Sequence, residues 1–369
     1  MEISKLVGEL IDSGHSFFVG VPDSTLKGLT EVLDQNPKVE HHVAANEGVA
    51  LTIAAGYQLS SNKVPVVYLQ NSGLGNLINP FMSLAHQEVF DIPILFLIGW
   101  RGMDGINDEP QHLPQGRITE ELLKLMGIQY KIIKKEEDYK LGIEIQSKTQ
   151  KSFALLFPPK ILDHASLSDN FKSINSEMDL SREQAIDITL DFLNSDDLIV
   201  STTGKTSREI YEIIRKTNVD RNFFMNIGSM GHASSIALGL ALNKPQNRIV
   251  IFDGDGALQM HLGALCNISN LKNHDFLHIL LANGTHSSVA GSRIANPDLN
   301  YLQLFKLFNY TNNYEVSSKD DLIDVLGRIN ECKGLTSIVI NINNEERDGL
   351  LRPSESPVKQ KQVFKSRIN

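Results

Sequence analysis

Short, continuous apolar runs alternate along this chain with longer stretches in which apolar residues recur every three or four positions. Continuous runs of valine, isoleucine, leucine and phenylalanine are typical of strands buried on both faces of a parallel sheet, and the longer stretches are typical of helices that cover it. The predicted strands are residues 16–21, 39–44, 64–69, 92–98, 198–201, 249–252, 276–281 and 336–342. This alternation predicts an α/β fold with doubly wound parallel sheets.

The pattern divides into two halves of similar length. Phe157-Pro158-Pro159 closes the first half, and the residues that follow are mixed and polar without a clear period. We therefore predict a first domain at residues 1–160, a linker at 161–180 and a second domain at 181–369.

Capping residues and periodicity predict several helix boundaries. Ser24 is expected to cap a helix that begins near Thr25, and Ser181 is expected to cap the first helix of the second domain. The apolar spacing over residues 258–271 predicts one continuous helix. The residues after 342 are expected to form a polar tail.

Composition and charge narrow the functional class. The chain has 369 residues and a net charge of −9, which argues against a general binder of nucleic acid or of membrane surfaces, because such a binder needs a basic face. The apolar run at residues 92–100 is far shorter than the roughly 20 residues that span a membrane. Two cysteines, Cys266 and Cys332, form no disulfide framework. With no apolar leader at the start of the sequence, we expect a cytoplasmic protein.

One stretch combines a buried strand with polar groups suited to a metal. Ile249-Val250-Ile251-Phe252 runs directly into Asp253-Gly254-Asp255-Gly256, and Asn283 follows the next predicted strand. Because the carboxyl ends of parallel strands meet at one edge of a sheet, Asp255 and Asn283 are expected to face one site. Their oxygen atoms suit Mg²⁺, although each motif alone also marks an ordinary turn.

Two other motifs allow more than one interpretation. Glu47 stands among small residues at a turn from strand to helix, where its carboxylate could face an apolar ligand or could simply favour the helix dipole. Gly204-Lys205-Thr206 follows a strand, as in a nucleotide-binding P-loop. That motif needs a glycine five positions before Gly204, and the chain has Ile199 there, so the P-loop is excluded. The hydroxyl, glycine and lysine groups can still contact a diphosphate.

Gly-Asp-Gly at 254–256, with Asn283 at this distance, resembles the signature of thiamine diphosphate enzymes. Members of that family have two doubly wound domains, one for the aminopyrimidine and one for the diphosphate, with the cofactor between them at a dimer interface. The resemblance implies that Asp255, Asn283 and the Thr285 backbone carbonyl bind Mg²⁺. It also implies that Glu47 hydrogen-bonds the aminopyrimidine ring and helps to activate the cofactor. The other implied cofactor contacts are Gly204, Lys205, Thr206, Ser229, Met230, Gly254, Gly256 and Ala257, of which Met230 wedges the cofactor into its bent form.

Blocks spread over nearly the whole chain resemble phosphonopyruvate decarboxylases, with sulfopyruvate decarboxylases as the nearest relatives. The blocks are residues 20–24, 70–79, 98–102, 108–116, 202–208 and 352–357. The resemblance implies decarboxylation of phosphonopyruvate to phosphonoacetaldehyde, a reaction of phosphonate biosynthesis. Sulfopyruvate or another acidic 2-oxo acid is the alternative substrate. A carboligase on the same scaffold, or a non-catalytic module that binds thiamine and Mg²⁺, also remains open.

The substrate and the proton that replaces CO₂ need further groups. Histidine titrates near neutral pH, and His112 and His286 lie in loops near the matched blocks, so both are candidate general acids. An anionic 2-oxo acid calls for cationic side chains, and Arg101, Lys205 and Arg293 are available. By resemblance, Asp23 and Ser24 line the substrate end.

The loop after Asn283 departs from the family pattern. The resembled enzymes have an acidic residue where this chain has Ser287, and Gln-Pro where it has Ser292-Arg293. Arg293 is therefore either a second contact to the anion or a solvated loop charge, and the identity of the substrate depends on this loop. The resemblance also implies a homodimer or a homotetramer with the cofactor at the subunit interface.

Overall fold

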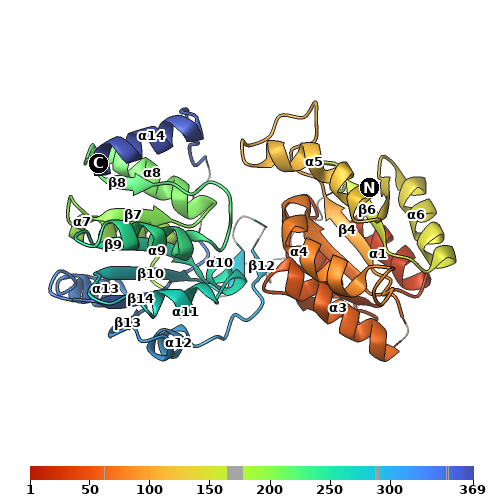
Figure 1. Cartoon of the computed structure of the whole chain (residues 1–369), viewed down its shortest axis with the longest axis horizontal. Coiled ribbons are helices and arrows are strands. Elements are labelled where there is room, and N and C mark those ends of the chain that lie inside the picture. The colour runs from red at the N-terminus through yellow and green to blue at the C-terminus, as the bar shows by residue number, and fades with distance from the viewer. Residues whose placement is uncertain (62, 164–177, 287–288, 290, 346, 348) are drawn as a thin grey trace. The chain divides into compact units, whose positions relative to one another are not determined.

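The computed structural model describes residues 1–61, 63–163, 178–286, 289, 291–345, 347 and 349–369, and the chain forms two compact units (Figure 1). The first unit is Met1–Asp169 with Ser288–Ala295, and the second is Asn170–Ser287 with Asn296–Asn369. Most of the linker predicted at 161–180 lies outside the described residues.

The first unit is built on a six-stranded sheet with the order β2-β1-β3-β4-β6-β5, in which every neighbouring pair is parallel. Its strands are β1 (Phe17–Gly20), β2 (Glu40–Val43), β3 (Val66–Gln70), β4 (Leu95–Gly99), β5 (Gln129–Ile132) and β6 (Phe153–Phe157). The central strands β3, β4 and β6 are almost wholly buried, because helices cover both faces of the sheet.

The helices of the first unit divide between two apolar cores. One core contains side chains of α3, α4 and α5, and the other contains side chains of α1, α2 and α6. The helical segments are α1 (Ile3–Asp12), α2 (Leu29–Asp34), α3 (Glu47–Ser61), η1 (Asn71–Gly73), α4 (Leu74–Pro80), η2 (Phe81–Ala85), α5 (His112–Leu125) and α6 (Glu136–Thr149).

The second unit repeats this plan with a parallel sheet of order β13-β14-β10-β9-β7-β8. Its strands are β7 (Leu198–Ser201), β8 (Asn222–Phe224), β9 (Ile249–Gly254), β10 (Phe276–Ala282), β13 (Asn312–Val316) and β14 (Leu335–Asn341). Two short strands, β11 (Thr285–His286) and β12 (Ser292–Arg293), lie in the loop after β10.

Helices cover both faces of the second sheet as well. One apolar core contains side chains of α7, α8 and α13, and the other contains side chains of α9, α11 and α12 (Figure 1). The helices are α7 (Arg182–Phe192), α8 (Lys205–Thr217), α9 (Ala233–Asn243), α10 (Asp255–Met260), α11 (Ala264–Ile268), α12 (Tyr301–Leu307), α13 (Lys319–Leu326) and α14 (Pro357–Ile368). None of the helices among the described residues is long and apolar enough to cross a membrane.

The predicted α/β fold with doubly wound parallel sheets is confirmed, and all eight predicted strands are present within a few residues of their expected bounds. The sequence patterns missed β5, β6, β8 and β13 of the two large sheets, as well as the two-residue strands β11 and β12. Three of these, β5, β8 and β13, are edge strands, and their residues are only partly buried, so they lack the continuous apolar run of a central strand. The cap of α7 is as expected, since the Gln184 N–H donates to the Ser181 hydroxyl over 3.3 Å.

Two helix predictions were wrong. No helix begins near Thr25: α2 starts at Leu29, and the turn before it is held by Asp23, whose Oδ2 accepts from the Leu26 N–H at 3.2 Å. The helix predicted over 258–271 breaks between α10 and α11. The polar tail contains the helix α14, which packs its only buried side chain, Phe364, against Phe224.

Candidate active site

Glu47 is a buried carboxylate at the carboxyl-terminal edge of the first sheet. It follows β2 as the first residue of α3, and its side chain accepts a hydrogen bond from Asn76 of α4, with 2.7 Å between Nδ2 and Oε2. Burial raises the pKa of Glu47 against the smaller opposing effect of that hydrogen bond. Gly73 packs directly against the carboxylate, because a Cβ there would overlap it. The structure thus holds an acidic group with a raised pKa in one fixed position.

Asp23 lies at the same edge of the sheet, beyond the end of β1. Its side chain is only 3% exposed and accepts from Gln70 Nε2 at 2.7 Å, as well as from the Leu26 N–H. Burial raises the pKa of Asp23, and the hydrogen bonds and Arg101 oppose this rise. Gly99, the last residue of β4, leaves the room that the carboxylate occupies, since a Cβ at that position would overlap Asp23 Oδ2.

Arg101 is fixed from both its backbone and its side chain. Asn71, which is fully buried, donates to the Arg101 carbonyl at 2.9 Å and accepts from the Arg101 N–H at 3.0 Å. The guanidinium group makes a two-point ion pair with Asp108, and Nη1 donates to Ser24 Oγ at 3.0 Å. A guanidinium has five N–H donors, and the described residues use three of them, so two remain for an anion among these residues.

Asp108 keeps its charge in this arrangement. Burial alone would raise its pKa, but hydrogen bonds from Arg101 and from the N–H groups of Glu109 and Gly102 outweigh burial, so the pKa lies well below the usual range. The ion pair therefore persists at every pH at which the protein is expected to work.

His112 begins α5 close to Arg101 and Asp108, whose charges act on it in opposite senses. Burial is the main cause that lowers the pKa of His112, so the ring is neutral at pH 7. Its buried Nδ1 has no hydrogen-bond partner within the described ranges. Gly102, at φ +69°, packs against the His112 backbone and leaves no room for a side chain.

Asp255 lies at the carboxyl-terminal edge of the second sheet and is 3% exposed. Its Oδ1 accepts from the Gly256 N–H at 2.7 Å, and its Oδ2 accepts from the N–H groups of Asn283 and Gly284 at 2.9 and 2.7 Å. Burial raises the pKa of Asp255 to about 6, against those three hydrogen bonds. The neighbouring strand ends of β9 and β10 thus meet at this carboxylate, as the parallel order predicts.

Asn283 and Thr285 are both buried beside Asp255. The Thr285 N–H donates to Asn283 Oδ1 at 3.2 Å, while Asn283 Nδ2 and Thr285 Oγ1 donate to Asn344 Oδ1 at 2.9 and 3.0 Å. Gly284 between them has φ +72°, which glycine adopts without strain. The structure therefore gathers Asp255, Asn283 and Thr285 into one connected group.

The turn from β7 to α8 lies next to the Gly254 turn. Thr202 is 4% exposed, its N–H donates to the Phe252 carbonyl at 2.7 Å, and its hydroxyl has no partner within the described parts of the chain. Gly204 has φ +83°, and α8 begins directly after it with Lys205 and Thr206. An unpaired buried hydroxyl at the N-terminal end of a 13-residue helix suits an anionic ligand such as a diphosphate.

The passage with Met230 is a second tight turn in this unit. Ser229 has φ +45° and Gly231 has φ +84°, and Met230 between them is partly exposed. A Cβ at Gly231 would lie 2.6 Å from the His261 ring and 2.9 Å from Met260 Cβ, so only glycine fits there. The turn leaves Met230 partly exposed, so it is accessible to a ligand.

His286 and Arg293 lie in the loop after β10. Ser287, at which this chain departs from the family pattern, lies outside the described residues. Burial lowers the pKa of His286 to about 4. Arg293 donates from Nη2 to Asp34 Oδ1 at 3.3 Å, and Ser292 Oγ lies 3.0 Å from Thr30 Oγ1. Within the first unit, these two contacts hold the end of the loop.

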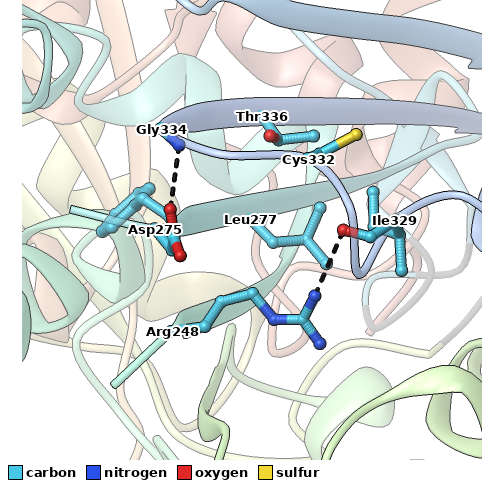
Figure 2. Close-up of a pocket in the computed structure, with 8 residues that line it drawn as sticks. Arg248, Asp275, Leu277, Ile329, Cys332, Gly334 and Thr336 are labelled. Atoms are coloured by element: carbon cyan, nitrogen blue, oxygen red, sulfur yellow. Dashed lines mark hydrogen bonds between the residues drawn. The ribbon is translucent and has the colours of Figure 1, made fainter. Parts of the chain in front are cut away.

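A small pocket at the opposite edge of the second sheet is separate from these groups (Figure 2). Two hydrogen bonds join residues that line it: Asp275 Oδ1 accepts from the Gly334 N–H at 2.9 Å, and Arg248 donates to the Ile329 carbonyl. Arg248 also donates to Asp197, outside the lining. Because Asp275 and Gly334 stand at the amino ends of β10 and β14, this pocket is not part of the candidate site.

Sequence reasoning missed several residues that hold the predicted ones in place, among them Asn76, Asp108 and Asn344. Asn76 contacts Glu47, Asp108 pairs with Arg101, and Asn344 contacts both Asn283 and Thr285. Asn76 and Asp108 lie in blocks that carry the family resemblance, so those blocks could have pointed to them. For Asn344 the only signal was its position just after the last strand.

The second unit offers oxygen ligands rather than a cluster of charged ones. No group of three or more His, Cys, Asp or Glu side chains among the described residues could hold a metal ion. Asp255, the Asn283 amide and the Thr285 carbonyl are hard oxygen donors that fit Mg²⁺, which commonly takes one or two carboxylates together with phosphate and water. A buried carboxylate with a raised pKa is also a group that a bound cation would stabilise in its charged form.

Known proteins resemble this chain over nearly its whole length. Residues 1–123 match the model of the thiamine pyrophosphate enzyme N-terminal TPP binding domain, and residues 202–340 match that of the C-terminal TPP binding domain. A phosphonopyruvate decarboxylase from Streptomyces viridochromogenes is 30% identical, covering 98% of this chain and 94% of its own, and one from Streptomyces hygroscopicus is 29% identical, covering 96% and 90%. A sulfopyruvate decarboxylase from Methanosarcina acetivorans is 27% identical, covering 90% and 89%.

Proposed function

The chain belongs to the thiamine pyrophosphate enzymes, within the family of the phosphonopyruvate and sulfopyruvate decarboxylases, and we propose that it converts phosphonopyruvate to phosphonoacetaldehyde and CO₂. As a member of this family it is a carbon–carbon lyase that acts on a 2-oxo acid. The observation that carries the choice of substrate is the 30% identity to a phosphonopyruvate decarboxylase over 98% of the chain. In the proposed reaction the bond from the carboxylate to the keto carbon breaks, and that carbon gains a proton.

Residues of both units are proposed to hold thiamine diphosphate (thiamine pyrophosphate). Residues 1–160 would form the aminopyrimidine-binding domain, residues 161–180 the linker and residues 181–369 the diphosphate-binding domain. In the second, Asp255, Asn283 and the Thr285 carbonyl would hold Mg²⁺. The other proposed contacts are Gly204, Lys205, Thr206, Ser229, Met230, Gly254, Gly256 and Ala257. When bound, the cofactor supplies a carbon nucleophile for the keto group and accepts the electron pair that CO₂ leaves behind.

Glu47 is proposed to hydrogen-bond the aminopyrimidine ring and to move the proton on which activation of the cofactor depends. Its burial and its raised pKa support this role, because a carboxyl group with a pKa closer to neutrality exchanges a proton more readily at the working pH. Asn76 and Gly73 fix the carboxylate in one position, which favours a directed proton transfer over a mobile surface acid.

Arg101 and Ser24 are proposed to bind the anionic end of the substrate. Because the net charge is −9, attraction of an anionic substrate must come from local positive groups, and the Arg101 side chain is 22% exposed. Two of its N–H donors have no partner among the described residues. Asp108 holds this guanidinium beside Ser24, while Asn71 fixes the Arg101 backbone, so the remaining donors are held ready for a phosphonate. Arg293 is proposed as a second contact to the anionic substrate. In that role the substrate would compete with Asp34, with which Arg293 forms an ion pair.

His112 and His286 are proposed as the groups that return a proton to the product carbon. Burial lowers the pKa of both rings, so each is neutral at pH 7 and could return a proton only as a relay, by releasing one from its N–H while its other nitrogen takes one up. His112 is supported further by its nearness to Arg101 and by its unpaired Nδ1 within the described residues. Asp23, a buried carboxyl group with a raised pKa, is proposed to line the substrate end and is a third acid in this group.

Sulfopyruvate is the second candidate substrate, because a sulfopyruvate decarboxylase is 27% identical over 90% of the chain. A phosphonate and a sulfonate both present a tetrahedral anion to Arg101, and they differ mainly in charge. The test is a panel of 2-oxo acids with the purified protein, thiamine diphosphate and Mg²⁺, in which kcat/KM is compared for phosphonopyruvate, sulfopyruvate and pyruvate. A higher kcat/KM for sulfopyruvate would replace the proposed substrate, and product analysis with an added aldehyde would reveal a carboligase.

The active form is proposed to be a homodimer or a homotetramer in which the cofactor lies between subunits. The proposal rests on the family, and it agrees with the placing of Glu47 in one unit and of Asp255 in the other. Sedimentation of the active enzyme tests it, because an active protein that is strictly monomeric would contradict the proposed assembly.

A further inference from the structure

Asn344 connects two of the residues that are proposed to bind Mg²⁺. It follows β14, the neighbour of β10 in the sheet, and its Oδ1 accepts from Asn283 Nδ2 at 2.9 Å and from Thr285 Oγ1 at 3.0 Å. One oxygen atom therefore fixes the side chains of Asn283 and Thr285 at the same time. Neither sequence motifs nor the family resemblance pointed to this residue.

The orientation of the Asn283 amide follows from a fixed donor. A backbone N–H cannot accept a hydrogen bond, so the Asn283 atom that lies 3.2 Å from the Thr285 N–H must be Oδ1. Nδ2 then points to Asn344, whose facing atom must in turn be an acceptor. The three groups thus select one of the two possible amide orientations, and they do so without any reference to a metal.

This orientation matters because an amide has a donor end and an acceptor end. A cation is attracted by the oxygen and repelled by the NH₂ group, so a flipped Asn283 would remove a ligand and add a repulsion. With no acceptor at position 344, Nδ2 would lose its hydrogen bond to Asn344, and the preference set by the Thr285 N–H would lose this support. Thr285 would lose the hydrogen bond from its Oγ1 to Asn344.

We propose that Asn344 is a positioning residue for the metal site: together with the Thr285 N–H it holds the Asn283 amide in one orientation, and it also holds the Thr285 side chain in place. The inference rests on the proposed function, because it assumes the Mg²⁺ site at Asp255. Asn344 is not proposed to touch the metal. Residues that orient metal ligands in this way typically change metal affinity 10- to 100-fold when they are removed.

The test measures Mn²⁺ binding to the full-length protein in the presence of saturating thiamine diphosphate. Binding is monitored by electron paramagnetic resonance, in which the signal of free Mn²⁺ decreases as the ion binds. We expect Asn344→Leu, which removes the acceptor at similar volume, to raise the Kd for Mn²⁺ about 10- to 100-fold. Asn344→Asp keeps an acceptor and should stay within a few-fold of the wild type. Asn344→Ala is the second variant if Asn344→Leu does not fold, and the same rise in Kd is expected.

The matched control is Asn341→Ala. Asn341 ends the same strand, but its amide donates to Glu315 and Ser317, away from Asn283. The Asn341→Ala variant should bind Mn²⁺ with the same Kd as the wild type. An equal loss of Mn²⁺ affinity in Asn341→Ala and Asn344→Leu would show a general effect on the sheet edge and overturn the inference. Unchanged binding in both Asn344→Leu and Asn344→Ala would also overturn it.

Asp255→Ala separates this inference from the proposed function. One outcome would support the metal site but not the role of Asn344. In it, the wild type binds Mn²⁺, Asp255→Ala does not, and the Asn344 variants bind Mn²⁺ as tightly as the wild type. If the wild type takes up no Mn²⁺ with the cofactor present, the metal site and the inference fail together.

Discussion

The Asn76 amide donates a hydrogen bond to the Glu47 carboxylate, with 2.7 Å between Nδ2 and Oε2. The two residues are 29 positions apart and belong to neighbouring helices, α4 and α3. This contact holds an acidic group in a buried place where its charge is disfavoured. A stable helix start does not require a buried carboxyl group, so this contact supports the role proposed for Glu47.

Glu47→Gln is expected to retain the cofactor and to lose most turnover. Glutamine has the same shape and can still accept from Asn76, but it cannot exchange a proton. Removal of a general acid–base group typically costs about 10²- to 10⁴-fold in rate. The measurements are kcat with phosphonopyruvate and cofactor binding by calorimetry, and an unchanged kcat would remove Glu47 from the mechanism.

The same variant should be more stable than the wild type at high pH. Because burial raises the pKa of folded Glu47 above its unfolded value of about 4.3, the folded state binds a proton that the unfolded chain loses. That contribution to stability is present below about pH 4 and is lost as the pH rises through the folded pKa. Glu47→Gln should therefore melt at the same temperature as the wild type near pH 4 and several degrees higher at pH 8, by about 2–4 °C for each kcal/mol gained.

A melting temperature at pH 8 that is equal to or below that of the wild type would contradict the buried charge at Glu47. Thermal unfolding at pH 4, 6 and 8 provides the comparison. Since the expected difference grows with pH, a constant offset at all three values would indicate a packing effect instead.

Gly73→Ala is expected to displace Glu47. An added Cβ would overlap the Glu47 carboxylate, which is held on its other side by Asn76, so the acid must move from its position. We expect kcat to fall about 10-fold or more while the protein stays folded, since a small misplacement of a catalytic group is costly. Gly75→Ala, two residues later in α4, is the matched control, because its Cβ would meet nothing within 4 Å. Equal kcat values for the two variants would contradict the close packing of Gly73 on Glu47.

Arg101→Lys is expected to impair substrate binding although the charge is kept. Lysine cannot make the two-point pair with Asp108 and also donate to Ser24, so the variant loses the fixed guanidinium donors that are proposed to bind the anion. A hydrogen bond to a charged group contributes about 1.5–3 kcal/mol, and so kcat/KM should fall roughly 10- to 150-fold, mostly through KM. Arg117→Lys on the exposed side of α5 is the control and should leave both constants unchanged. A fall confined to kcat would assign Arg101 to the chemical step instead.

The sequence predicted those parts of the site that depend on local pattern. Apolar runs located the strand ends, and parallel order then brought Asp255 within hydrogen-bond distance of the Asn283 backbone. Glu47 was expected at a turn from strand to helix and is the first residue of α3. In each case the apolar run that forms a strand also fixes where its polar end must lie.

Contacts between distant segments could not be predicted in this way. Nothing in the local pattern indicates that Asn76 meets Glu47 or that Asn344 meets Asn283, because these pairs depend on how helices and strands pack. The same reason explains the error at Thr25. Ser24 has the chemistry of a helix cap, but in the folded protein its hydroxyl accepts from Arg101, and Asp23 holds the turn instead.

The most direct measurement of the proposed function is CO₂ release from phosphonopyruvate by the purified protein, assayed with both thiamine diphosphate and Mg²⁺ and with either one removed. We expect CO₂ and phosphonoacetaldehyde in equal amounts, formed only when both are present and reduced about 100-fold or more in Glu47→Gln. No CO₂ from phosphonopyruvate under these conditions, or release that does not depend on the cofactor, would contradict it.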